Sequence, residues 1–344
     1  MEQILAEFLS GLHWLLLAGV ITGCLAMLAR AADWLVDEAV ILSERSGLPK
    51  VVIGATVVSL GTTTPEAVVS VLAALQGHPG LALGNAVGSI ICDTGLILGV
   101  ACLISPLPLD RRIVNRQGWI QFGCGVLLVV ACVLGSDYAL IFSEGGLLPR
   151  GVGFLFLALL FVYLTMTVRW ARSENGSLPL ELELAHSKEE SSSVVVILSK
   201  LVAAIGVVVV ASWLLIPSVA EAATRLGVPD SIIAATIVAF GTSLPELVTA
   251  VSAARHGHGE LAVGNIIGAD ILNVLFVAGA SAAATAGGLA APPHFFTLYF
   301  PSMILILVVF RIGIFSSQKY LKWPFGVILL ATYGLVTVLS YVWK

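Results

Sequence analysis

An internal repeat is the feature that most constrains how this 344-residue chain can fold. Residues 47–95 align without gaps to residues 227–275, and 22 of the 49 aligned positions are identical. In this alignment Glu66 matches Glu246. A match of this length between distant segments indicates that the chain is built from two related structural units.

Composition indicates that both units lie in a membrane. Apolar residues make up 58% of the chain and charged residues 11%, against about 25% charged in soluble domains. Several apolar runs approach the roughly 17–25 residues that cross a bilayer as a helix. We predict an all-α integral membrane protein with ten transmembrane helices, near residues 11–37, 51–76, 80–104, 117–135, 150–169, 195–220, 229–255, 260–286, 294–314 and 323–343.

Ten helices and one repeat give two five-helix halves, residues 1–170 and 195–344, joined by a polar linker at 171–194. The first half holds the repeat at 47–95 and the second half holds its copy. Because each half has an odd number of spans, the second half enters the membrane in the opposite direction. Inverted repeats of this kind are typical of secondary transporters.

Basic residues predict the orientation, since cytoplasmic loops carry more Lys and Arg than loops on the other side. The opposite loops hold only Arg150, Arg225 and Lys344. We therefore expect a multi-pass protein of the plasma (inner) membrane, with a cytoplasmic linker and both termini on the extracytoplasmic side. The basic residues of the predicted cytoplasmic loops are Arg45, Lys50, Arg111, Arg112, Arg116, Arg169, Arg172, Lys188, Arg255, Arg311, Lys319 and Lys322.

The second predicted helix of each half carries a Gly-Thr-x-x-Pro-Glu motif, at residues 61–66 and 241–246. Pro65 cannot donate the hydrogen bond that the carbonyl of Gly61 would accept in a helix, and Pro245 has the same effect in the second copy. A carbonyl freed at bilayer depth needs a partner, and a cation is one.

Oxygen-bearing positions of these motifs recur at helical spacing and are predicted to share one helix face. Calcium takes six to eight oxygen ligands, and two glutamates would balance its charge. A glutamate inside the membrane is costly and marks function, and no Lys or Arg lies near either glutamate in the sequence. The predicted faces consist of Ser59, Thr62, Thr63 and Glu66 in the first half and Ala239, Thr242, Ser243 and Glu246 in the second.

The third predicted helix of each half begins with Gly-Asn-x-x-Gly and adds a second polar face. Asp270 lies one position beyond this face, and two roles are open for it: lining an ion pathway or bonding a neighbouring backbone. The Gly-x-x-x-Gly pairs favour close helix packing. The predicted faces are Asn85, Ser89 and Asp93 in the first half and Asn265, Ala269 and Asn273 in the second.

These motifs resemble the two inverted alpha-repeats of the sodium/calcium exchanger family, in a compact form without a regulatory domain. The resemblance implies that Glu66 and Glu246 are the principal calcium ligands and that the first and sixth helices slide across the other eight. It also implies that several further groups help to bind calcium and sodium, namely backbone carbonyls around Ser59, Thr62, Ala239 and Thr242 and the side chains of Thr63, Ser243 and Ser89.

The chain departs from the family pattern at several positions of the two motifs. Asp93 stands where the first repeat commonly has asparagine, and Asn273 stands where many second repeats have aspartate, so one acid has exchanged sides. Asp270 adds a further acid, which leaves sodium, proton or potassium coupling open. Other departures are Thr63 in place of serine, Ile90 in place of asparagine and Ala269 in place of serine.

The sequence thus predicts a secondary active antiporter that exchanges Ca²⁺ for Na⁺, with Ca²⁺/H⁺ or K⁺-dependent antiport as alternatives. A cation channel fits the duplicated halves less well, and an enzyme would need a nucleophile and base or a histidine-rich metal site. The predicted partners are the two transported ions and the lipid bilayer. No resident cofactor or nucleic acid is expected, and a monomer is compatible with the sequence.

Overall fold

The computed structural model describes residues 8–136, 140–174, 193–226, 241–317 and 319–342. Within these ranges nine helical spans are long and apolar enough to cross a membrane. They match nine of the ten predicted spans. Of the remaining one, residues 244–255 form α13 (Leu244–Arg255), while residues 229–240 lie outside the described part of the chain.

Five of the nine spans are single α-helices, and four contain a π-helical segment, in which an extra residue per turn redirects the side chains. The uninterrupted spans are α2 (Trp14–Ser46), α7 (Arg111–Leu134), α8 (Arg150–Glu174), α10 (Val194–Arg225) and α17 (Trp323–Val342). The interrupted spans are α3–η1–α4 (Lys50–Ile53, Gly54–Val58, Ser59–Leu75), α5–η2–α6 (Pro79–Ile91, Cys92–Ile97, Leu98–Ile104), α14–η5–α15 (Gly259–Leu272, Asn273–Ala278, Gly279–Ala284) and η6–α16 (Phe295–Tyr299, Phe300–Ser316).

The start predicted for the fourth helix, near residue 117, was wrong, because α7 begins at Arg111. The side chain of Asp110 accepts hydrogen bonds from the backbone of Arg112 and Ile113 and so caps the helix. Arg116 then packs its guanidinium over the ring of Trp170, 4.7 Å from the centroid. Long arginine side chains can extend from the first turns of a membrane helix to its interface.

The linker was predicted to span residues 171–194, but it begins later, because α8 continues through Glu174. Ser193 caps α10, and its side chain accepts a hydrogen bond from the backbone of Val195. Residues 175–192 of the linker lie outside the described ranges.

Two small antiparallel sheets join loops that lie far apart in the sequence. β1 (Leu107–Pro108) pairs with β4 (Tyr320–Leu321), and β2 (Gly146–Leu148) pairs with β3 (Leu289–Ala291). Paired strands must lie on the same side of the membrane. The first pair joins two loops predicted to be cytoplasmic, and the second joins two loops predicted to lie opposite. The pairing is therefore consistent with the predicted alternation of the loops.

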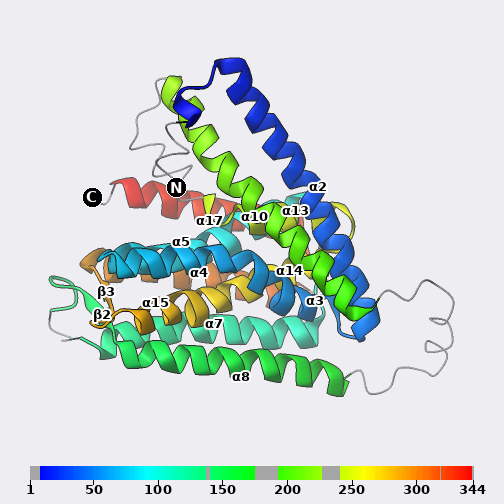
Figure 1. Cartoon of the computed structure of the whole chain (residues 1–344). Coiled ribbons are helices and arrows are strands. Elements are labelled where there is room, and N and C mark those ends of the chain that lie inside the picture. Colours follow the sequence, from blue (N-terminus) through cyan, green and yellow to red (C-terminus); the bar gives the residue numbers. More distant parts are fainter. Residues whose placement is uncertain (1–7, 137–139, 175–192, 227–240, 318, 343–344) are drawn as a thin grey trace.

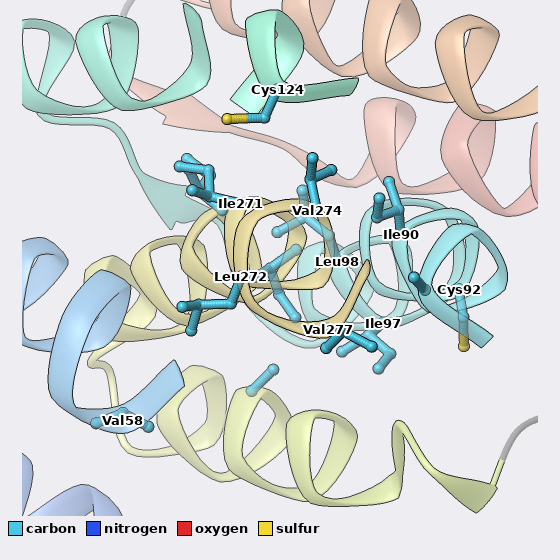
Figure 2. Close-up of a cluster of buried hydrophobic side chains, with 14 of the residues drawn as sticks. Val58, Ile90, Cys92, Ile97, Leu98, Cys124, Ile271, Leu272, Val274 and Val277 are labelled. Carbon is cyan, nitrogen blue, oxygen red and sulfur yellow. The ribbon is translucent and has the colours of Figure 1, made fainter. Parts of the chain in front are cut away.

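The span α14–η5–α15 is the central helix of the fold, since every residue of α14 except Glu260 is buried. Its apolar side chains pack against those of the span α5–η2–α6 (Figure 2). The labelled side chains of the two spans are Ile271, Leu272, Val274 and Val277, and Ile90, Cys92, Ile97 and Leu98.

The same central helix approaches the backbone of α3 and η1 through its two glycines. A Cβ atom on Gly268 would lie 2.6 Å from both the Cα of Ala55 and the Oγ of Ser59. Gly264 faces the carbonyl of Val51 even more closely. The Gly-x-x-x-Gly pair of the second repeat therefore lets the two helix backbones come into direct contact.

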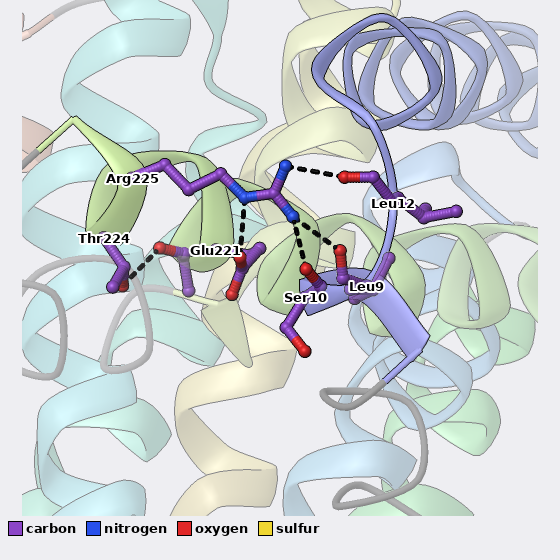
Figure 3. Close-up of polar contacts among 7 residues, drawn as sticks. Leu9, Ser10, Leu12, Glu221, Thr224 and Arg225 are labelled. Atoms are coloured by element: carbon purple, nitrogen blue, oxygen red, sulfur yellow. Dashed lines mark hydrogen bonds and ion pairs between the residues drawn. The ribbon is translucent and has the colours of Figure 1, made fainter.

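Helices α2 and α10 form a pair that stands apart from the other spans (Figure 1). At 33 and 32 residues they are about 50 Å long, which exceeds the roughly 30 Å hydrocarbon core and requires tilt. Arg225, at the end of α10, donates to the carbonyls of Leu9, Ser10 and Leu12 and pairs with Glu221 (Figure 3). These bonds tie the segment just before α2 to the end of α10.

We expect Gly268→Ala to destabilise the protein, because the added methyl group would force the central helix away from η1. Overpacking of this kind costs about 1–3 kcal/mol. The melting temperature of the purified protein should fall. Gly123→Ala is the matched control, since a Cβ at Gly123 on α7 would meet nothing within 4 Å. Equal melting temperatures for the two variants would contradict the close packing.

Candidate functional site

The first Gly-Thr-x-x-Pro-Glu motif lies on a continuous helix. Pro65 is inside α4, and the predicted face of this helix is completely enclosed. The four side chains of the face, each with no exposed surface, are Ser59, Thr62, Thr63 and Glu66. For the first repeat, the predicted helical face is therefore confirmed.

The second motif has a different backbone. Thr242 and Ser243 form a turn, and α13 begins at Leu244 with Pro245 and Glu246 in its first turn. The prediction of one helical face was wrong here, because the chain is not helical at Thr242 and Ser243. A carboxylate in the first turn of a helix is favoured by the helix dipole. Ala239 lies outside the described residues.

The two glutamates are brought together by α4 and α13. The hydroxyl of Thr63 donates a hydrogen bond to Oε1 of Glu246 over 3.2 Å, although the two residues belong to different repeats. Glu66 and Glu246 are close enough for their charges to interact, and Asp93 also acts on Glu66. Three acidic side chains therefore share one buried region.

Most of the carboxylate oxygens in this region have no hydrogen-bond partner. Both carboxylate oxygens of Glu66 are buried and unpaired, and so is Oε2 of Glu246. Ser243 Oγ is a further unpaired buried oxygen. Unsatisfied buried carboxylate oxygens are costly, so their accumulation at one place points to a ligand that accepts electron pairs.

Asp93 and Asn273 complete this region from the third helix of each repeat. The amide of Asn273 donates to Oδ2 of Asp93 over 3.5 Å, which joins the two positions at which the acid has exchanged sides. Asp93 lies in η2 and Asn273 opens η5, so π-helical turns position both side chains. Ser89 is also buried, one turn before Asp93, and Ala269 provides no side-chain oxygen at the equivalent place.

The two asparagines of the Gly-Asn-x-x-Gly motifs differ in their surroundings. Asn85 is half-buried, donates to Ser70 and accepts a hydrogen bond from Thr242. Asn265 is fully buried, and neither of its side-chain polar atoms has a hydrogen-bond partner. The part of the site near Asn85 is thus more accessible than the part near Asn265.

Asp270 belongs to a polar cluster of its own, since its hydrogen-bond partners are not residues of the glutamate region. Its Oδ2 accepts hydrogen bonds from the hydroxyl of Thr94 and from the amide of Gln121 on α7. Sequence reasoning did not single out Thr94 or Gln121. An uncharged amide within the apolar α7 was the available signal for Gln121.

The chemistry of the shared region suits a hard cation. Carboxylate, hydroxyl and carbonyl oxygens are the ligands preferred by Ca²⁺ and Na⁺, whereas Zn²⁺ is held by nitrogen and sulfur. Within the described ranges, no three His, Cys, Asp or Glu side chains meet closely enough to hold a metal alone. A bound cation would therefore need the hydroxyl and carbonyl oxygens of α4, α13 and the third helices as well as carboxylates.

The fold and this buried acidic region define a multi-pass membrane transport protein with an intramembrane site suited to cations. The sequence model of the sodium/calcium exchanger protein family matches residues 16–169 and 196–342, one match for each half. The chain belongs to this family. It is a cation/calcium antiporter by family and fold.

Similar proteins span nearly the whole chain. The sodium/calcium exchanger MaX1 of Methanosarcina acetivorans is 32% identical over 342 residues, which cover 92% of this chain and 97% of that protein. The inner membrane protein YrbG of Escherichia coli is 33% identical over 290 residues, covering 84% of this chain and 85% of YrbG. A structure of the sodium-calcium exchanger NCX_Mj, soaked with Na⁺ and Sr²⁺, superposes with a TM-score of 0.76 at 27% identity, covering 94% of this chain and 98% of that one.

Thr63→Val tests the bond between the two repeats. The variant removes the hydrogen bond from Thr63 to Oε1 of Glu246 and deprives the site of an oxygen. Hydrogen bonds to charged groups contribute about 1.5–3 kcal/mol, so we expect calcium binding to weaken roughly 10- to 100-fold. Calcium-45 binding to the purified protein measures this.

Thr64→Val is the matched control for this prediction, because the hydroxyl of Thr64 is exposed and donates to the carbonyl of Leu60 within its own helix. It should bind calcium as the unmodified protein does. Equal binding by the two variants would mean that Thr63 does not contribute to the site.

Proposed function

We propose that the protein exchanges Ca²⁺ for Na⁺ across the membrane, with Glu66 and Glu246 as the principal calcium ligands. The observation that carries this proposal is the pair of unpaired, fully buried oxygens on Glu66, beside a second buried glutamate. Ser59, Thr62, Thr63, Ser89, Ser243 and Asp93 are proposed to supply further oxygens, together with the carbonyls around Ala239 and Thr242.

Charge explains why such a site would exchange ions. Two or three carboxylates without counter-ions are costly in an apolar interior. The conformational switch should therefore be favoured only when cations fill the site, either one Ca²⁺ or several Na⁺. Sodium that enters down its gradient would then displace calcium, which leaves on the opposite side.

We propose alternating access in which α2 and α10 slide as one unit. These helices contact each other extensively, and Lys200 of α10 pairs with Glu38 of α2 over 3.3 Å. A link to the other helices is the hydrogen bond from Ser252 of α13 to Asp33 of α2. Such a link would have to break when the pair moves.

The proposed membrane topology has ten spans in two inverted five-helix halves. Both termini are placed on the extracytoplasmic side of the plasma (inner) membrane, and the linker is placed in the cytoplasm. The paired strands β1–β4 and β2–β3 support the two-sided arrangement of the loops. The transport unit is proposed to be a monomer.

Proton or potassium coupling is the second candidate, and the acids other than the two glutamates favour it. Asp93 and Asp270 are both buried and their charges interact, yet neither appears in an ion pair among the described residues. Buried acids close to one another can carry a proton in place of a metal ion.

Calcium-45 uptake into sodium-loaded proteoliposomes tests the proposed function. Uptake that requires an outward sodium gradient, and that continues when an ionophore removes any pH gradient, would support sodium/calcium exchange. Dependence on external potassium would identify a potassium-requiring exchanger. Uptake driven only by a proton gradient would mean that the coupling ion is the proton and not sodium. Uptake without any counter-ion would indicate a channel.

Glu66→Gln and Glu246→Gln should each reduce exchange to the level of liposomes without protein, because each removes a carboxylate that balances the calcium charge. Uptake of calcium-45 under a sodium gradient measures the effect. Glu260→Gln is the control, since Glu260 lies in the first turn of α14 and outside the proposed site. Substantial uptake by either glutamine variant would contradict the assignment.

The exchanged positions of aspartate and asparagine give a further prediction. Asp93→Asn alone removes a carboxylate and should weaken the dependence of uptake on sodium. The double variant Asp93→Asn, Asn273→Asp restores one acid to the same contacting pair and should recover most of that dependence. Sodium titrations of calcium-45 uptake compare the two. If the double variant does not recover this dependence, the repeat that carries the acid matters, as well as the presence of an acid.

A further inference from the structure

Outside the region of the two glutamates, Asp270 is the centre of a second buried polar cluster. This residue is 2% exposed and belongs to the central helix α14. Gln121 Nε2 lies 2.5 Å from Oδ2 of Asp270 and 3.1 Å from the hydroxyl of Thr94. The three side chains come from three different spans: α14, α7 and the span α5–η2–α6.

Two oxygens of this cluster have no hydrogen-bond partner. They are Oδ1 of Asp270 and Oε1 of Gln121, and both are buried. Both donors of the cluster are already directed at Oδ2, so no described donor remains for the other two oxygens. A metal cation is the ligand that would satisfy two such acceptors together.

The charge of the cluster limits which cation fits. Asp270 is its only acidic member, and no ion pair within the described residues includes Asp270. One carboxylate balances one positive charge, whereas Ca²⁺ would leave an uncompensated charge in an apolar interior. A monovalent cation therefore fits better than a divalent one.

The cluster is next to the glutamate region but distinct from it. Thr94 directly follows Asp93 in η2, so the π-helical turn directs successive side chains to the two regions. The charges of Asp93 and Asp270 are close enough to interact. A cation at Asp270 would therefore lower the repulsion that Asp93 experiences and couple the two regions.

We propose that Asp270, Gln121 and Thr94 form an additional binding site for one sodium ion, beside the site of the two glutamates. Asp270 Oδ1 and Gln121 Oε1 are the ligands, and Thr94 and the amide of Gln121 hold the carboxylate in position. This inference extends the proposed exchange function, but its test is a binding measurement that does not require exchange.

The test is binding of sodium-22 to the purified full-length protein, with choline chloride replacing sodium chloride. The double glutamate variant, which carries both Glu66→Gln and Glu246→Gln, should retain saturable sodium binding that excess calcium displaces poorly. Adding Asp270→Asn should weaken the remaining binding at least 10-fold. With both glutamates intact, Asp270→Asn should lower the number of sodium ions bound per protein by one, which covers the case in which the double variant does not fold.

A matched pair on α7 separates ligand loss from disturbance of the helix. Gln121→Leu removes the proposed ligand and should weaken the same sodium binding. Gln117→Leu removes an amide one turn earlier, which donates to Thr167, and should leave sodium binding unchanged. Size-exclusion profiles and melting temperatures establish that each variant is folded.

Absence of saturable sodium binding in the folded double glutamate variant between pH 6 and 9 would overturn the proposal and leave Asp270 as a protonated or purely structural acid. Unchanged sodium stoichiometry in Asp270→Asn would overturn it as well. Retention of all cation binding, calcium included, in the double glutamate variant would instead contradict the proposed function.

Discussion

Carboxylates buried without a basic partner are the constraint on which the rest of this structure depends. Glu66 and Glu246 are enclosed by helices in an apolar membrane protein, and three of their four oxygens have no hydrogen-bond partner. The free energy cost of such an arrangement is large unless cations occupy it. The proposed link between ion occupancy and conformational change follows from this cost.

The scaffold holds these acids in place through close backbone packing. The central helix α14 reaches η1 at distances that only glycine permits, as at Gly268. The π-helical segments η2 and η5 then turn Asp93 and Asn273 toward each other. The pair α2 and α10 stands apart from this packed part of the molecule (Figure 1), and it is the unit proposed to slide.

Much of the fold could be predicted because membrane helices are fixed by local composition. Nine spans, the enclosed face of α4 and the family all followed from apolar runs and repeated motifs. The start of α7 was misplaced because arginine was assigned to a loop, whereas Asp110 caps a helix that includes Arg111, Arg112 and Arg116. The turn at Thr242 and Ser243 was also missed, since the repeated motif suggested equal backbones.

The sequence by itself determined the membrane location, the two related halves and the residue types of the acidic motifs, because hydrophobicity and spacing act within a segment. Only the tertiary structure decided which oxygens share a region and which do not. It separated Asp270 from the glutamates and joined it to Gln121, a residue of another span. Such contacts depend on how helices distant in the sequence pack, and no local pattern encodes that arrangement.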